Sequence, residues 1–335
     1  MLESTTESQA MAGSTPLVTI IGGSGFVGRY IAQRMARRGW RVRVAVRRPN
    51  EAMFVKPYGV VGQVEPVQCN VRDEVSLRAV ITGADAVVNC VGVLWQSGKN
   101  TFKATQAEGA ARIARIAADE QVARFVHISA IGADAESESQ YARTKAAGEA
   151  AVLEAMPDAV ILRPSVVFGT EDGFFNQFAG LSKLTPALPL VGGGTRFQPV
   201  WVEDVAEAAA RAVAGEVNSG LYELGGPRVA TFRECMELML RVIRRRRLLI
   251  DLPFFLANII ATFAQTTAWI GVQPLLTRDQ IKLLRKDNVV GEDAKGFDAI
   301  GIAPTAMEAV LDSYLYAYRP YGQYTALSET HQSDA

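Results

Sequence analysis

The sequence predicts an α/β fold, in which a doubly wound parallel sheet is followed by a smaller C-terminal α/β lobe. Short β-branched runs alternate with longer helical runs from residue 17 to residue 168, and a glycine-rich turn follows the first run. Strands separated by helices join through right-handed crossovers, which produce a parallel sheet covered on both faces. The 335 residues are 49% hydrophobic, which is enough for a sizeable core.

Each element follows from a local pattern. The first helix places Val27, Ile31 and Met35 on one face and stops at Gly39. The predicted strands are 17–21, 41–46, 66–71, 85–92, 124–130 and 159–169, and the predicted helices are 26–38, 74–81, 101–120 and 138–156. After residue 169 the pattern loosens into short strands, helices and Gly/Pro turns. We therefore expect a sheet domain over 17–168 and a lobe over 169–324 that covers the strand ends, with crossings of the chain between the two left open.

The composition narrows the class of protein. Lys+Arg and Asp+Glu are both 35, so no net charge attracts the chain to nucleic acid, and with only two histidines no metal site is expected. Three cysteines without CxxC spacing indicate reduced thiols. Residues 1–16 lack an apolar core and any arginine, which predicts a disordered leader and favours a bacterial cytoplasmic protein; residues 325–335 are predicted to be a disordered tail.

The glycine-rich stretch VTIIGGSGFVGRYIA (residues 18–32) predicts a nucleotide site. Gly22, Gly25 and Gly28 form G-x-x-G-x-x-G between the first strand and the first helix. At such a turn, backbone N–H groups and the positive helix end can approach a pyrophosphate, and the last glycine lets helix and sheet pack closely. A tight turn alone would explain two of the glycines. The predicted cofactor contacts are Gly22, Gly23, Ser24, Gly25, Phe26, Val27 and Gly28.

The end of the second predicted strand indicates which nucleotide binds. A Rossmann protein that uses NAD usually has an acid here, which binds the ribose hydroxyls. This chain has Arg47 and Arg48 instead, and a guanidinium can hold the 2′-phosphate of NADP(H). Arg29 is a weaker second candidate for a phosphate contact. The alternative is a pair of solvated surface arginines.

A second set of polar residues predicts chemistry. Tyr141 and Lys145 are four residues apart on a predicted helix, so their side chains share a face. The ammonium is expected to lower the pKa of the phenol and to hold the nicotinamide ribose, which would let the tyrosine act as a general acid or base. Ser129 ends the fifth predicted strand and would bind the substrate oxygen. A surface pair is the alternative.

These motifs resemble the short-chain dehydrogenase/reductase superfamily in its extended or atypical branch. IGGSGFVG is similar to the cofactor loop, CNVRDEVSL to the adenine-contact segment, VVNCVG to the fourth-strand motif, and HIS with YARTK to the catalytic segments. LRPSVVFG and GGGTRFQPVWVEDVAEA are similar to motifs of the substrate lobe. The resemblance implies further cofactor contacts at Asn70, Val71, Val91, Gly92 and Pro164, although Asn70 stands where the family usually has an aspartate.

A more specific resemblance reaches to about Tyr321. SQYARTKAAGE, VFGTEDGFFNQFA, QPVWVEDVA and LLTRDQIKLLRKDNVV are together similar to the nucleotide-binding accessory subunits of respiratory complex I and their bacterial relatives. This resemblance implies a tightly held NADPH with a mainly structural role. It also implies contacts with complex I subunits near the junction with the membrane arm, on the matrix or cytoplasmic side.

The C-terminal third joins cations to an apolar stretch. Arg241, Arg244, Arg245, Arg246 and Arg247 precede residues 252–276, which proline, asparagine and glutamine interrupt. A helix lying on an anionic lipid surface fits this pattern, and a buried helix with solvated arginines fits it as well. A membrane span is the least favoured of the three. With the complex I resemblance, we expect a peripheral protein on the cytoplasmic side of the bacterial inner membrane.

Three functions follow. The first is an NADP(H)-binding accessory subunit or assembly factor of the respiratory NADH:quinone oxidoreductase. The alternative is a free-standing NADP-dependent reductase or epimerase, in which Tyr141 donates the proton, Lys145 tunes it and Ser129 orients the substrate. The third is an NADP-sensing regulator without chemistry. Phe174, Phe175, Phe197 and Trp201 line either an apolar pocket or a packed core.

Overall fold

The structure, a computed structural model, describes residues 15–267 and 276–322. The predicted tail lies outside these residues, as do residues 1–14 of the predicted leader and residues 268–275 of the apolar stretch. The strands are β1 (Leu17–Ile21), β2 (Arg41–Val46), β3 (Val64–Gln68), β4 (Ala86–Asn89), β5 (Arg124–Ile128), β6 (Val160–Pro164), β7 (Val167–Phe168), β8 (Ala187–Val191), β9 (Arg196–Phe197), β10 (Val200–Trp201), β11 (Gly220–Leu224), β12 (Ala230–Thr231) and β13 (Leu248–Leu252).

The α-helices lie between these strands and after them. They are α1 (Phe26–Arg37), α2 (Glu74–Ile81), α3 (Glu108–Asp119), α4 (Gln140–Ala155), α5 (Phe175–Leu184), α6 (Val202–Ala214), α7 (Phe232–Val242), α8 (Phe254–Thr267), α9 (Arg278–Leu283), α10 (Phe297–Ile300) and α11 (Met307–Leu315). Two 3₁₀ helices, η1 (Pro49–Tyr58) and η4 (Tyr316–Tyr318), and a π-helical turn, η2 (Lys103–Ala107), complete the described elements. The predicted helix 74–81 is confirmed at both ends.

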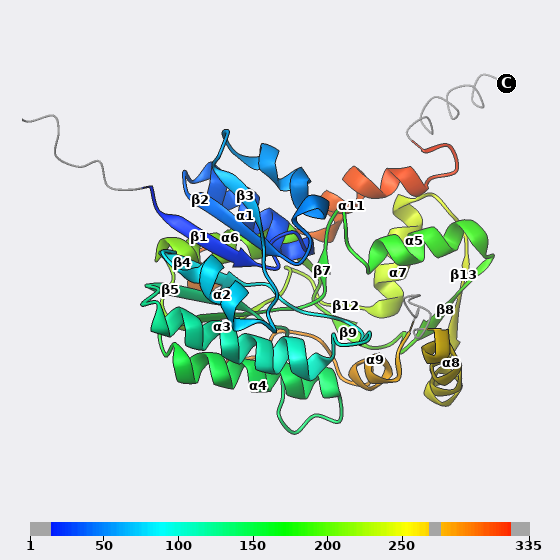
Figure 1. Ribbon diagram of the computed structural model, residues 1–335. Helices are drawn as coiled ribbons and strands as arrows, with labels where there is room; N and C mark the ends of the chain where they lie inside the picture. The colour runs from blue at the N-terminus through cyan, green and yellow to red at the C-terminus, as the bar shows by residue number, and fades with distance from the viewer. Residues whose placement is uncertain (1–14, 268–275, 323–335) are drawn as a thin grey trace, which may run out of the picture.

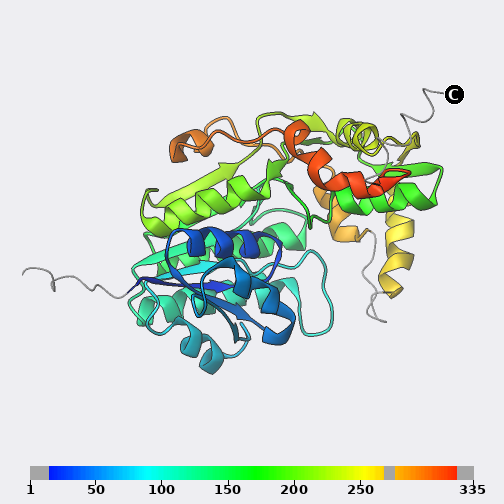
Figure 2. The same ribbon diagram turned by 90° about the horizontal axis from the view of Figure 1, so that it is seen from above.

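Seven strands form one parallel sheet in the order β11-β6-β5-β4-β1-β2-β3. The order reverses direction at β1, so crossovers lie on both faces. Helices α1 and α6 pack on one face and α2, α3 and α4 cover the other (Figures 1 and 2). Each face buries its own apolar cluster, and this burial is the main stabilising contribution of the domain. The predicted doubly wound α/β fold is confirmed.

The last strand of the sheet comes from beyond residue 169. The predicted strand 159–169 splits into β6, which stays in the sheet, and β7, which pairs with β10. Ser165 lies at the split, where its N–H bonds Leu224 of β11 and its hydroxyl donates to Asn288 Oδ1 at 2.7 Å. The chain thus leaves the sheet after β6, passes through part of the second lobe, and returns through α6 to β11.

The second lobe lies beyond the carboxyl ends of the central strands (Figure 1). Its core comes from α5, α7, α11 and the short strands around them. Phe174, Phe175, Phe197 and Phe232 meet edge to face or tilted, with ring centroids 4.9–6.1 Å apart. The aromatic residues that the sequence left between pocket and core therefore form a packed core, against which Trp201 also packs.

Candidate nucleotide-binding site

The glycine turn lies between β1 and α1, where the predicted motif placed it. Gly22 has φ +78°, a backbone conformation that residues other than glycine rarely adopt. Its N–H bonds the Ala45 carbonyl of β2 at 2.9 Å, and its own carbonyl accepts from Gly25 N at 3.0 Å. These two bonds hold the turn against the neighbouring strand.

Packing explains two further glycines of the turn. A Cβ added at Gly28 would lie 2.6 Å from the Gly22 oxygen and 2.7 Å from the Gly23 Cα, and one added at Gly23 would lie 2.9 Å from the Ile20 oxygen. Helix, turn and strand therefore touch backbone to backbone. These glycines are required for packing whether or not a ligand binds.

Gly25 is different because it is exposed and stands at the N-cap of α1. No side chain caps this helix end and no acidic residue lies in its first turn. The first N–H groups of a helix have no acceptor within the helix, and at α1 no side chain supplies one. This helix end therefore presents positive partial charge and unpaired donors outward. Ser24, Phe26 and Val27 are partly exposed around it. The arrangement is suited to an anion such as a pyrophosphate.

The arginines after β2 have the exposure that the phosphate hypothesis needs. Both Arg47 and Arg48 are exposed at the carboxyl end of β2, the strand next to β1. Arg48 pairs with Glu51 at 2.9 Å, whereas no ion pair or hydrogen bond of the Arg47 side chain occurs among the described residues. Arg29 donates to the Ser24 carbonyl, pairs with Glu171 at 3.2 Å and lies over the Phe54 ring. Of these three arginines, Arg47 is therefore the one whose guanidinium is available to bind a phosphate.

Tyr141 and Lys145 lie one turn apart on α4, with Lys145 Nζ 6.0 Å from the centre of the tyrosine ring. Lys145 is buried and donates to the Ile128 carbonyl at 3.1 Å, and burial lowers its pKa to about 8. Burial raises the pKa of Tyr141 to about 12. The expectation that the lysine lowers the phenol pKa is therefore wrong, because burial desolvates the phenolate and raises the pKa. Tyr141 stays protonated at neutral pH.

Two buried polar atoms beside this pair have no partner among the described residues: Ser129 Oγ and His127 Nε2. The two residues are two apart at the end of β5, so their side chains point to the same face. A buried donor or acceptor without a partner is costly, and it marks a place where a water or a ligand can bind. The hydroxyl of Ser129, which was predicted from sequence, therefore lies where a water or a ligand would supply its missing hydrogen-bond partner.

The sequence reasoning missed His127 and the role of Asn89. Asn89 Nδ2 lies 3.1 Å from His127 Nδ1, which fixes the ring so that Nε2 carries the hydrogen. Burial, with a smaller contribution from Lys145, lowers the pKa of His127 to about 3, so the ring is a neutral donor. A histidine within the apolar run RFVHI was the one available signal.

The contacts implied by resemblance lie along the same edge of the sheet. Val71 and Val91 pack at the rim of the core on the α2–α4 side, and Asn89 Oδ1 accepts from Val91 N at 3.0 Å. A Cβ at Gly92 would lie 3.5 Å from Lys145 Nζ. The remaining two are Asn70, whose Oδ1 accepts from Arg72 N at 3.2 Å after β3, and Pro164, which ends β6.

The site as a whole fits a nicotinamide dinucleotide. One edge of the sheet carries the glycine turn and the uncapped end of α1 after β1, the exposed Arg47 after β2, and the buried Lys145 of α4 beside the end of β5. In open α/β sheets ligands bind at this edge, where the strand order reverses. The orphaned Ser129 hydroxyl is a polar group that a ligand at this edge would satisfy.

Fold and site together define the class of protein, a Rossmann-type dinucleotide-binding protein. More particularly, the sequence profile of the NAD dependent epimerase/dehydratase family matches residues 18–225. The chain belongs to this family. The crystal structure of the Escherichia coli NADPH-dependent quinone oxidoreductase QOR2 complexed with NADPH shares the fold, with a TM-score of 0.69 and 17% identity over 89% of this chain and 98% of that one.

Two curated relatives are similar over most of their length. An Arabidopsis thaliana mitochondrial protein, NADH dehydrogenase (ubiquinone) 1 alpha subcomplex subunit 9, is 35% identical over 318 residues, which are 91% of this chain and 79% of that protein. The ceramide reductase of Caulobacter vibrioides is 33% identical over 257 residues, 76% of this chain and 78% of that protein. The predicted resemblance to the short-chain dehydrogenase/reductase superfamily is confirmed by the family profile, and the predicted resemblance to complex I accessory subunits by the Arabidopsis protein.

The arginine run has a mixed structural role. Arg245 donates to the Tyr318 carbonyl and Arg247 to the Ser182 carbonyl, both at 2.8 Å, so these two connect the ends of helices. Arg241, Arg244 and Arg246 are exposed. Within residues 15–267 and 276–322 we find no helix with the length and apolar character that a membrane crossing requires.

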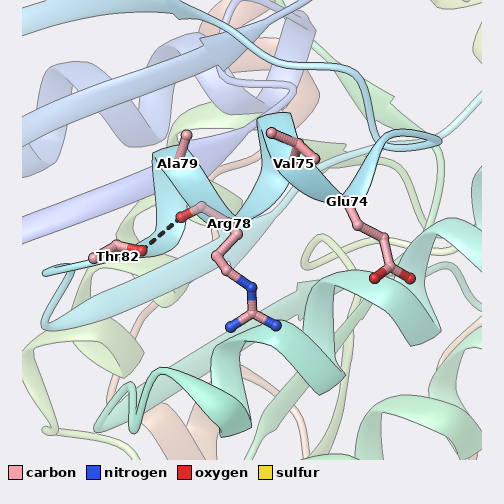
Figure 3. A pocket seen from close by; sticks show the side chains of 5 residues that line it. All are labelled: Glu74, Val75, Arg78, Ala79 and Thr82. Atoms are coloured by element: carbon pink, nitrogen blue, oxygen red, sulfur yellow. Dashed lines mark hydrogen bonds between the residues drawn. The ribbon is translucent and has the colours of Figure 1, made fainter.

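A pocket on the outer face of α2 stands apart from this site. Figure 3 shows its lining residues, which are Glu74, Val75, Arg78, Ala79 and Thr82. Arg78 pairs with Asp119 at 2.9 Å and Glu120 at 2.6 Å, at the end of α3, so its guanidinium is satisfied within the protein. The pocket contains none of the predicted cofactor or catalytic residues.

Proposed function

We propose that the protein is an NADP(H)-binding accessory subunit, or an assembly factor, of the respiratory NADH:quinone oxidoreductase. The observation that carries the proposal is the extent of similarity to subunits of that enzyme. It covers 91% of this chain, whereas the family profile ends at residue 225. The similarity to the respiratory subunits therefore extends past the family profile into the C-terminal part.

In this role the cofactor is mainly structural. The end of α1 and the glycine turn would hold the pyrophosphate, Arg47 the 2′-phosphate, and Lys145 the nicotinamide ribose. A ligand that binds only the folded state stabilises that state in proportion to the logarithm of its concentration over Kd. Tight binding of NADPH would thus stabilise the strand edge against which the second lobe packs.

The same proposal gives the C-terminal region a docking role. On α8, Phe255, Leu256, Ile259 and Ile260 are 39–64% exposed, and Arg241 at the end of α7 and Arg246 just before β13 are also exposed. Exposed apolar side chains suit contact with partner subunits, and exposed cations suit contact with an anionic lipid surface. We infer a peripheral position near the junction with the membrane arm, on the cytoplasmic side of the bacterial inner membrane.

A second function is a free-standing NADP-dependent reductase or epimerase. The similarity to a ceramide reductase over 76% of the chain favours it, as does the arrangement of Tyr141, Lys145 and Ser129. Bound nicotinamide supplies or accepts a hydride. Tyr141, protonated at neutral pH, would donate the proton to a substrate oxygen, and the Ser129 hydroxyl would orient that oxygen.

Two measurements test the proposal. Denaturing the purified protein should release NADPH in near-stoichiometric amount, and release of NAD alone or of no nucleotide would contradict the cofactor assignment. Extraction of membranes with mild detergent, followed by affinity capture and mass spectrometry, should recover subunits of the NADH:quinone oxidoreductase. Recovery of the protein alone, in the soluble fraction, would favour the reductase.

A further inference from the structure

The helix that carries Tyr141 and Lys145 is capped from the far end of the sequence. The Asp279 carboxylate on α9 accepts three hydrogen bonds at the start of α4: from Gln140 N and Ser139 Oγ at 2.8 Å and from Tyr141 N at 3.0 Å. Ser139 Oγ in turn accepts from Ala142 N at 3.3 Å. The first three N–H groups of α4, which have no acceptor within the helix, are thereby satisfied.

Helix α9 is itself held rigidly at this place. Thr277 and Gln280 form a reciprocal capping box at its N-terminus, and Lys282 Nζ donates to the Glu138 carbonyl at 3.1 Å, just before α4. Asp279 is half-buried, and its negative charge faces the positive end of a 16-residue helix. The cap combines hydrogen bonding with favourable electrostatics.

The other side of α9 contacts α8. Ile281 is buried against Ala257 and Ala261 of α8, and Phe254 and Leu284 pack around them. The opposite side of α8 exposes the four apolar residues assigned above to docking. One continuous series of packed residues and hydrogen bonds therefore runs from the exposed face of α8, through Ile281 and Asp279, to the backbone of Tyr141.

We propose that Asp279 is a positioning residue that couples the nucleotide site to α9 and to the exposed apolar face of α8. Fixing α8 and α9 holds the first turn of α4, and with it Tyr141 and Lys145, in the geometry that binds the nicotinamide ribose. Coupling between two binding events is reciprocal, so the nucleotide also orders α8 and α9 for docking. The inference rests on the proposed function, because it takes NADPH as the ligand of the site.

The coupling is tested by measuring the affinity for NADPH of the full-length wild type and of two variants at residue 279. Asp279→Ala removes all three acceptor contacts and should weaken NADPH binding about tenfold, whereas Asp279→Asn, which keeps one acceptor oxygen, should lie between this variant and the wild type. Hydrogen–deuterium exchange is the second readout. NADPH should slow exchange in α9 and α8 of the wild type, and this protection should be lost in Asp279→Ala.

Asp204→Ala is the matched control. Asp204 also joins distant segments through a carboxylate, since it accepts from Thr305 N at 2.6 Å and from the Thr305 hydroxyl, but it lies on α6 and contacts no part of α4. It should lower stability and leave NADPH affinity within twofold. Equal losses of affinity in both variants, or unchanged affinity in Asp279→Ala, would overturn the coupling. Absence of NADPH binding by the wild type would instead refute the proposed function.

Discussion

The chain has two groups of arginines that look alike in sequence and differ in structure. Arg47 and Arg48 follow β2 at the carboxyl edge of the sheet, which carries the candidate nucleotide site (the nucleotide-facing edge), and both are exposed. In the run from Arg241, at the end of α7, to Arg247, just before β13, Arg245 and Arg247 donate to backbone carbonyls of η4 and α5. An arginine near unpaired carbonyl groups connects elements, whereas one beyond their reach remains available to a ligand.

The difference extends to the surroundings of each group. The nucleotide-facing edge is held by backbone contacts between β1, α1 and β2, so its shape depends on glycines rather than on side chains. The C-terminal region is held by side chains that reach across long sequence separations, such as Arg245 to Tyr318. Mutations should therefore affect the two regions in different ways, and four experiments test this comparison.

The largest effect is expected for Gly28→Val. Its branched side chain would collide with the backbone of Gly22 and Gly23, and overpacking against backbone that cannot move should cost about 3 kcal/mol or more. Thermal unfolding and nucleotide content should both fall. Gly173→Ala is the control, since a Cβ there meets nothing within 4 Å. A Gly28→Val protein with wild-type stability would refute backbone contact as the basis of this edge.

Acid should destabilise the nucleotide-facing edge through His127. The pKa of this histidine is about 3 in the folded protein and about 6.5 unfolded, so the unfolded state binds more protons between these values and stability falls as pH falls. Between pH 7 and pH 5 the loss should be about 2 kcal/mol. In denaturant titrations of nucleotide-free protein, His127→Phe should lack this part of the pH dependence. Parallel pH profiles of the two proteins would contradict the assignment.

Substituting Arg47 tests whether the exposed cation binds a phosphate. Arg47→Ala should weaken NADPH binding about tenfold and leave NADH binding nearly unchanged, because a charge-assisted hydrogen bond to the 2′-phosphate is lost. Arg41→Ala is the control, since Arg41 is exposed at the opposite end of the same strand. Titration calorimetry with both nucleotides measures the difference. Equal losses for NADPH and NADH would remove the 2′-phosphate assignment.

The smallest effects should separate two arginines of the C-terminal run. Arg245→Ala removes the bond to Tyr318 and should lower stability by about 1 kcal/mol in chemical unfolding. Arg246→Ala should leave stability unchanged and weaken binding to anionic vesicles by up to about 1 kcal/mol, an effect that falls with salt. If both variants lose stability equally, the two residues do not differ as the structure indicates.

Most of the sheet could be predicted because local periodicity determines it. The strand at residues 17–21 and the helix at 74–81 were placed correctly from apolar spacing, and the glycine turn from its motif. The π-helical turn before α3 and the split after Pro164 were not predicted, and at the split the chain is held by a contact from another part of the sequence. Ser165, for example, bonds Asn288, 123 residues away.

The candidate site shows the same division. The motifs identified Tyr141, Lys145 and Ser129, because those residue types at that spacing are informative by themselves. His127 was missed, since its importance comes from the absence of a partner for Nε2, which is a property of packing. The raised pKa of Tyr141 was missed because burial, and not sequence spacing, determines it.

The sequence by itself determined the order of strands and helices up to residue 168, the glycine turn and the presence of two arginines after the second strand, because these depend on residues close together in the chain. The tertiary structure alone decided which arginines are committed to carbonyl groups and which residue caps the helix of Tyr141. Asp279 lies 138 residues from that tyrosine, and only folding brings the carboxylate to the three donors that it satisfies.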